Sequence, residues 1–187
     1  MPDAAAALAE HRQLADRVAE LLPQVDDVAR RLVAAYESGG RVYTFGNGGS
    51  AADAQHFAEE LVARFKRERR PLPAQSLSSD ASVLTCIAND YSYEHVFERQ
   101  VRGFVREGDV VIGFSTSGRS PNVVRALAAA RELGATTVLF GGGDGGDASA
   151  HADHALVVPS TSTARIQEMH VLLLHIVIDH VDEWAAA

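Results

Sequence analysis

Short apolar runs alternate with longer amphipathic segments along most of the chain. The runs at 42–45, 110–114 and 136–140 are almost entirely apolar, which is typical of strands buried on both faces of a parallel sheet. Weaker strand patterns lie near 75–77 and at 154–158. The segments between them carry apolar residues at helical spacing, which predicts helices at about 50–66, 81–88, 93–105, 121–133 and 163–184. This alternation predicts an α/β fold, a three-layer sandwich with a five-stranded parallel sheet.

Two extra helices are predicted before the first strand. Residues 5–22 carry leucines and valines at helical spacing, and Pro23 begins a second helix that a glycine pair ends. A chain of 187 residues is long enough to bury one full core. We therefore expect a single domain over 1–187, in which 1–40 form the N-terminal helices and 41–187 form the α/β core.

A glycine-rich turn follows the first predicted strand and leads into a helix that opens at Ser50. The turn contains Gly46, Gly48 and Gly49. A helix that begins just after glycines presents unpaired backbone N–H groups and the positive end of its dipole, which suits a phosphate or another anion. Ser50 is expected to cap this helix and to offer its hydroxyl to the anion.

Two more turns of small and polar residues follow buried strands. Residues 115–120 read Ser-Thr-Ser-Gly-Arg-Ser, and residues 141–146 are rich in glycine. Parallel α/β sheets bind ligands at the carboxyl ends of their strands, where hydroxyls and backbone N–H groups can surround a phosphate. Serine and threonine also serve as plain turn residues. Matching turns after separate strands nevertheless favour phosphate binding, while the lack of a Gly-Lys-Ser/Thr element argues against a nucleotide P-loop.

A histidine and a carboxylate share one face of the helix after the glycine turn. His56 and Glu60 are four residues apart, which suits a metal site or an acid/base pair. The last predicted helix adds His170, His175 and His180 as candidates, and His175 lies within an apolar run where an imidazole needs a partner. Spacing alone does not pair His175 with Gln167, because eight residues span about 12 Å of a regular helix.

Composition and charge argue against several classes of protein. Hydrophobic residues make up 47% of the chain and the formal net charge is −8, which argues against a general nucleic-acid-binding surface. The single cysteine, Cys86, lies in an apolar context that predicts burial, and it excludes a disulfide within the chain. The start of the chain lacks the pattern of a signal peptide, and no apolar run reaches 18 residues, so we expect a cytoplasmic protein without a membrane partner.

Several motifs together resemble the phosphoheptose isomerases of the sugar isomerase (SIS) fold. They are Gly46-Asn-Gly-Gly-Ser-Ala-Ala-Asp-Ala-Gln-His-Phe-Ala-Glu-Glu-Leu61, Ala88-Asn-Asp-Tyr91, Glu107-Gly-Asp-Val110, Ser115-Thr-Ser-Gly118 and Arg165-Ile-Gln-Glu-Met-His170. They follow the order and spacing of that family from about residue 42 onward. The resemblance implies a flavodoxin-like SIS fold that converts sedoheptulose 7-phosphate to D-glycero-D-manno-heptose 7-phosphate, an early step toward nucleotide-activated heptoses. It further implies a homotetramer with active sites between subunits and one Zn²⁺ per subunit.

Carried over residue by residue, the resemblance implies a set of site residues. The zinc ligands would be His56, Glu60, Gln167 and His175. The contacts with the phosphorylated heptose would be Asn47, Gly48, Gly49, Ser50, Glu60, Asn89, Asp90, Ser115, Thr116, Ser117, Ser120 and Gln167. Isomerisation through an enediolate requires a base that moves a proton between adjacent carbons. Glu60 is the expected catalytic base and His175 its partner acid, while zinc would polarise the substrate oxygens.

One position departs from the family pattern. Many relatives have Asp three residues before the Gln of Arg-Ile-Gln-Glu, where this chain has Ala164. A small residue there also occurs in a replication-regulating branch of the fold that binds the initiator protein DnaA. That non-catalytic branch is the main alternative, although Glu60 and His175 favour the enzyme. A sugar-phosphate-sensing SIS module without catalysis is a third hypothesis.

Overall fold

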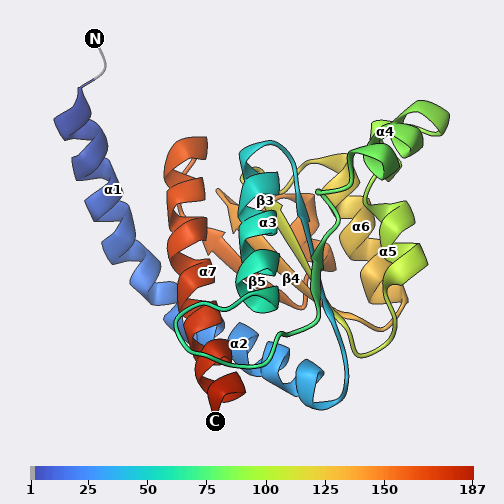
Figure 1. The fold of residues 1–187 in the computed structure, drawn as a ribbon. Coiled ribbons are helices and arrows are strands. Elements are labelled where there is room, and N and C mark those ends of the chain that lie inside the picture. The colour runs from blue at the N-terminus through green and yellow to red at the C-terminus, as the bar shows by residue number, and fades with distance from the viewer. Residues whose placement is uncertain (1–2) are drawn as a thin grey trace.

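Five parallel strands form one sheet in the computed structural model, which describes residues 3–187 (Figure 1). The strands are β1 (Val42–Gly46), β2 (Ala74–Ser76), β3 (Val110–Ser115), β4 (Thr136–Gly142) and β5 (His154–Val158). Their order across the sheet is β2-β1-β3-β4-β5, and each neighbouring pair is parallel. The carboxyl ends of β1, β3 and β4 therefore meet at one edge of the sheet, and the predicted α/β fold class is confirmed.

Helices cover both faces of the sheet (Figure 1). They are α1 (Ala4–Val18), α2 (Leu22–Glu37), α3 (Gly49–Val62), α4 (Ala81–Asp90), α5 (Glu98–Phe104), α6 (Pro121–Glu132) and α7 (Thr163–Ala186). One core contains α2, α3 and α7 together with one face of the strands, and a second core contains α5 and α6 with the opposite face. Among the helices described, none is long and apolar enough to cross a membrane.

The predicted N-terminal helices are present, and α1 reaches away from the body of the molecule (Figure 1). Leu14 and Val18 at its end are buried, whereas Leu8 is 50% exposed. The second helix carries Pro23 in its first turn, as expected from the fixed φ of proline.

Several predicted boundaries shift. The helix expected to reach residue 66 ends at Val62, and the one expected over 93–105 divides into a 3₁₀ turn at Tyr93–His95 and α5. Residues 89 and 90, expected in a turn, form the last turn of α4. The prediction that Cys86 is buried is wrong, because α4 lies at the periphery with only Ile87 buried and leaves the thiol exposed.

Candidate active site

A small pocket lies at the carboxyl ends of β1 and β3, beside the first turn of α7. Its volume is about 220 Å³. It is lined by Asn47, Gly49, Ser50, Phe114, Ser115, Thr116, Ser117, Ser120, Thr163 and Gln167. The glycine turn after β1 and the serine-rich turn after β3 thus meet in one pocket, as the strand pattern predicts. Hydroxyls and helix-start N–H groups line it, which is the chemistry of a phosphate site.

Glycine is required where α3 begins, for two separate reasons. Gly48 has φ +57°, in the region that favours glycine, and it occupies the N-cap position expected for Ser50. A Cβ on Gly49 would lie 2.4 Å from Nε2 of Gln167, so the glycine lets α7 approach α3. Ser50 instead lies in the first turn of α3 and is buried, so its expected role as the cap is wrong.

The third glycine-rich turn supports the serine-rich turn and does not line this pocket. A Cβ on Gly118, which has φ +62°, would lie 1.8 Å from the carbonyl oxygen of Gly145. Ala148 N–H also donates to the carbonyl of Gly118 at 2.9 Å. The turn at 141–146 thus packs against the backbone of the serine-rich turn at 115–120 and restricts its conformation.

The amide of Asn47 is held by two residues that the sequence analysis did not identify. Asn47 and Asn122 exchange two hydrogen bonds of 2.9 Å, and the Tyr93 hydroxyl donates to Oδ1 of Asn47 at 2.9 Å. The oxygen of Asn47 thus accepts two bonds and its amide nitrogen donates one, so the second amide N–H has no partner among residues 3–187. No local pattern singles out Asn122, because it lies in the first turn of a helix in a different part of the chain.

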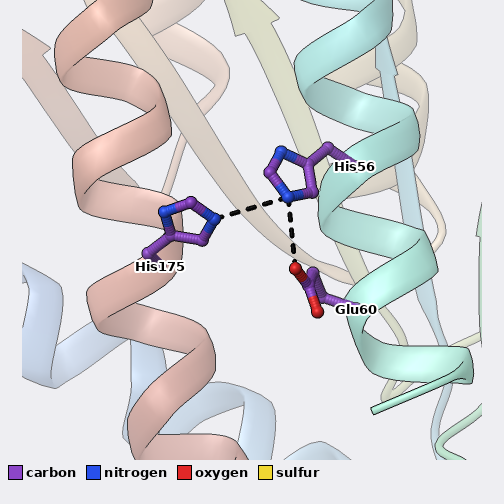
Figure 2. Close-up of side chains that lie close together, drawn as sticks. All are labelled: His56, Glu60 and His175. Atoms are coloured by element: carbon purple, nitrogen blue, oxygen red, sulfur yellow. Dashed lines mark hydrogen bonds and ion pairs between the residues drawn. The ribbon is translucent and has the colours of Figure 1, made fainter. Parts of the chain in front are cut away.

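His56, Glu60 and His175 come together between α3 and α7 (Figure 2). Nε2 of His56 lies 3.2 Å from Oε1 of Glu60 and 3.3 Å from Nε2 of His175. Two ligand atoms on a tetrahedral zinc with bonds of about 2.0–2.1 Å lie about 3.3–3.4 Å apart. Side-chain burial is partial, 35% exposed for His56 and 14% for Glu60. Two of the three separations therefore match those between zinc ligands, the ligand atoms of all three residues lie within 4.8 Å of one another, and solvent can reach the site.

The electrostatics of His175 also suit a metal ligand. Partial burial lowers the pKa of His175 below its usual range, and the neighbouring imidazole of His56 lowers this pKa further. A neutral imidazole keeps a lone pair for a cation, because the charged form binds none.

Gln167 lies at the pocket and not beside the trio. It lines the pocket near Gly49, about two turns of α7 before His175. Among residues 3–187, no hydrogen bond joins Gln167 to His56, Glu60 or His175. Its role as a metal ligand stays a prediction.

Four predicted substrate contacts do not line the pocket: Gly48 at the N-cap of α3, Glu60 in the trio, and Asn89 and Asp90 on α4. Asn89 and Asp90 are remote from both the pocket lining and the trio in sequence and element. Both are exposed at the end of α4, where the Asn89 amide donates to Oδ1 of Asp90 at 2.9 Å. Within one chain they do not line the pocket, so their role in substrate binding also stays a prediction.

Comparison with known proteins places the chain in a family. The family model described as SIS domain matches residues 8–142. A phosphoheptose isomerase of Pelobacter propionicus is 50% identical over 184 residues, which is 98% of this chain and 97% of the relative. The chain belongs to the phosphoheptose isomerase family of SIS-domain proteins. The expected resemblance is thus confirmed.

Solved structures of phosphoheptose isomerases agree with the fold. The one from Neisseria gonorrhoeae is 41% identical, with a TM-score of 0.90 over 96% of each chain. The one from Francisella tularensis is 34% identical, with a TM-score of 0.92 over 95% of each chain. These likenesses confirm the SIS fold and do not favour the DnaA-binding alternative that Ala164 had suggested.

Three further titratable side chains lie on α3 and α7. Asp53, on the α3 stripe between Gly49 and His56, is 8% exposed, and its Oδ2 has no hydrogen-bond partner in residues 3–187. Burial raises the pKa of Asp53 to about 6. His170 is fully buried against the carbonyl of Gly141, so it belongs to the core. His180 faces Asp26 of α2 at 3.6 Å, away from the trio.

Proposed function

We propose that this chain is an aldose–ketose isomerase that converts sedoheptulose 7-phosphate to D-glycero-D-manno-heptose 7-phosphate. The observation that carries the proposal is the layout of α3, which has the phosphate-type pocket at its start and the His56–Glu60–His175 trio further along. Gly49 and His56 are seven residues, or about 10 Å, apart along the helix. A sugar whose phosphate occupies the pocket can extend along α3 and present its carbonyl end to the trio.

The proposed reaction moves a carbonyl from C2 to C1 of the heptose. Glu60 removes the proton from C1 and returns it to C2, which passes through an enediolate. Only Oε1 of Glu60 faces His56, so we assign the proton transfer to Oε2. His175 exchanges the hydroxyl proton between O1 and O2 through Nδ1, because its Nε2 faces His56 and is the nitrogen assigned to the metal. This division lets one carboxylate serve both as a metal ligand and as a base.

The metal is proposed to be zinc, one ion per subunit. His56, Glu60 and His175 supply nitrogen and carboxylate donors at spacings that fit it, with Gln167 as the proposed fourth ligand. Bound zinc would polarise the oxygens on C1 and C2 and stabilise the enediolate charge.

Phosphate binding is proposed to depend on the pocket. Ser115, Thr116, Ser117 and Ser120 supply hydroxyls, and the turn at 47–50 supplies backbone N–H groups.

We further propose that one SIS domain spans 1–187 and that it assembles as a homotetramer with active sites between subunits. Asn89 and Asp90 are exposed and lie outside the pocket of their own chain, so we assign their proposed contact with substrate to the site of a neighbouring subunit. The exposed Leu8 of α1 and Leu22 of α2 offer apolar surface to a partner. The cytoplasmic location expected from the sequence remains part of the proposal.

The test is turnover of sedoheptulose 7-phosphate by purified protein, before and after treatment with a chelator. Parent protein is expected to form the aldose, and activity is expected to fall on chelation and return with zinc. Glu60→Gln should lose at least about 100-fold in kcat, because it removes the base. A protein without turnover and without bound metal, or a Glu60→Gln variant as active as the parent, would defeat the proposal.

A further inference from the structure

The loop between α3 and β2 is fastened to α7 through one buried carboxylate. Asp182 is 1% exposed. Its Oδ2 accepts the backbone N–H groups of Lys66 at 3.1 Å and Arg67 at 2.9 Å, and its Oδ1 accepts Nε–H of Arg69 at 3.0 Å. Two backbone bonds and a charged partner satisfy a carboxylate that would be costly to bury alone. The loop is therefore held rigidly against the helix that carries His175.

Arg69 joins the same anchor to the end of α3. Its side chain is fully buried, and its guanidinium donates to the carbonyls of Glu60 at 2.6 Å and Leu61 at 2.8 Å. These carbonyls belong to the last turn of α3, where no intrahelical donor follows. One guanidinium thus ties the backbone of Glu60 to Asp182 of α7 and binds carbonyls that the end of α3 at Val62 leaves without an intrahelical donor.

The loop also contacts the imidazole of His175, through Phe65. The ring of Phe65 stacks on the imidazole of His175, with centroids 5.3 Å apart and planes inclined by 18°. The ring of His56 meets the same imidazole edge-on, with a centroid distance of 4.9 Å (Figure 2). The orientation of His175 is thus set from one side by the loop and from another by its partner in the trio.

We propose that the loop over residues 63–70 is a positioning element that sets the separation and orientation of Glu60 and His175, acting on Glu60 through Arg69 and on His175 through Phe65. This inference rests on the proposed metal site. A metal site tolerates only a few tenths of an ångström in ligand position, and the trio spans α3 and α7, both of which this loop contacts. The phosphate pocket lies at the opposite end of α3 and does not contact the loop.

The experiment compares binding at the two ends of α3 in matched variants. Arg69→Lys keeps the charge beside Asp182 but removes the fork that reaches the Glu60 and Leu61 carbonyls. Phe65→Leu keeps an apolar side chain but removes the stacked ring. Arg106→Lys is the control for the first, because Arg106 also donates to carbonyls at a helix end, those of Gly103 and Val105.

Phe104→Leu is the control for the second substitution, because Phe104 is a partly exposed ring stacked on Tyr43, remote from the trio. Cobalt(II) is the metal probe, since its affinity and visible spectrum both report ligand geometry. Inorganic phosphate is the probe for the pocket. Circular dichroism and thermal melting confirm that each variant is folded.

Arg69→Lys and Phe65→Leu are each expected to weaken cobalt binding about 10-fold or more and to change the cobalt spectrum. Phosphate affinity should stay within about twofold of the parent, and kcat should fall with little change in KM. Both control variants should match the parent. If Arg69→Lys does not fold, Phe65→Leu decides the question.

Two results would overturn the positioning role alone: unchanged cobalt affinity and spectrum in the folded variants, or parallel losses of cobalt and phosphate binding, which indicate general destabilisation. A parent protein that neither binds cobalt nor turns over substrate would instead overturn the proposed function and this inference with it.

Discussion

His170 lies in the core where α7 meets the end of β4, and its protonation is expected to couple folding to pH. Its Nε2 is 3.0 Å from the carbonyl of Gly141, which can only accept, so this nitrogen carries the proton. Nδ1 is buried without a partner in residues 3–187. A charged imidazole would place a second N–H there without an acceptor. Burial accordingly lowers the pKa of His170 from its usual 6.5 to about 4.

The size and sign of the effect follow from this pKa. The pKa of His170 is lower in the folded protein than in the unfolded one. The free energy of unfolding therefore keeps its full value above about pH 6.5 and decreases as the pH falls toward 4. Two and a half pKa units correspond to a limit of about 3.4 kcal/mol, of which about 2.5 kcal/mol is lost between pH 7.5 and 4.5. His170→Leu removes this titration.

The assay is urea unfolding of parent and His170→Leu protein at a series of pH values and one protein concentration. Between pH 7.5 and 4.5 the free energy of unfolding of the parent should fall by about 2.5 kcal/mol more than that of the variant, since all other groups titrate in both proteins. The lost hydrogen bond to Gly141 shifts the variant equally at every pH. Parallel profiles for parent and His170→Leu, within about 1 kcal/mol, would refute the reasoning.

Other variants probe the pocket and its supports. Gly49→Ala should lower inorganic phosphate affinity about 10-fold, measured by calorimetry, because the new Cβ must displace the Gln167 amide 2.4 Å away; unchanged affinity would place the phosphate elsewhere. Asp53→Asn should stabilise the protein at pH 7 by about 1–3 kcal/mol, because burial raises the pKa of Asp53 to about 6 and the parent loses stability as the pH rises through it. That gain should vanish near pH 4 in urea unfolding, and a gain that is independent of pH would contradict it. Gly118→Ala should cost about 2 kcal/mol or more, since it adds a Cβ at positive φ against the Gly145 carbonyl; a melting temperature equal to that of the parent would argue against this contact.

Part of the site could be predicted from the sequence because it depends on residues that are close together in the chain. The glycine turn before α3 and the serine-rich turn after β3 each follow a buried apolar run, and parallel strands bring such turns to one edge. His56 and Glu60 share a helix face by spacing alone. The N-cap role predicted for Ser50 is wrong because it depends on the residue at which α3 begins. The burial predicted for Cys86 is wrong because it depends on how α4 packs against its neighbours.

The sequence by itself determined the alternation of strands and helices, the phosphate-type turns and half of the proposed metal site, because these depend on residues a few positions apart. Only the tertiary structure decided that α7 lies beside α3, which brings His175 to His56 across 119 positions. It also assigned supporting contacts to Asn122, Phe65 and Arg69, whose local sequence carries no such signal. Contacts between distant segments arise from packing on a shared sheet, and helical or strand periodicity does not encode them.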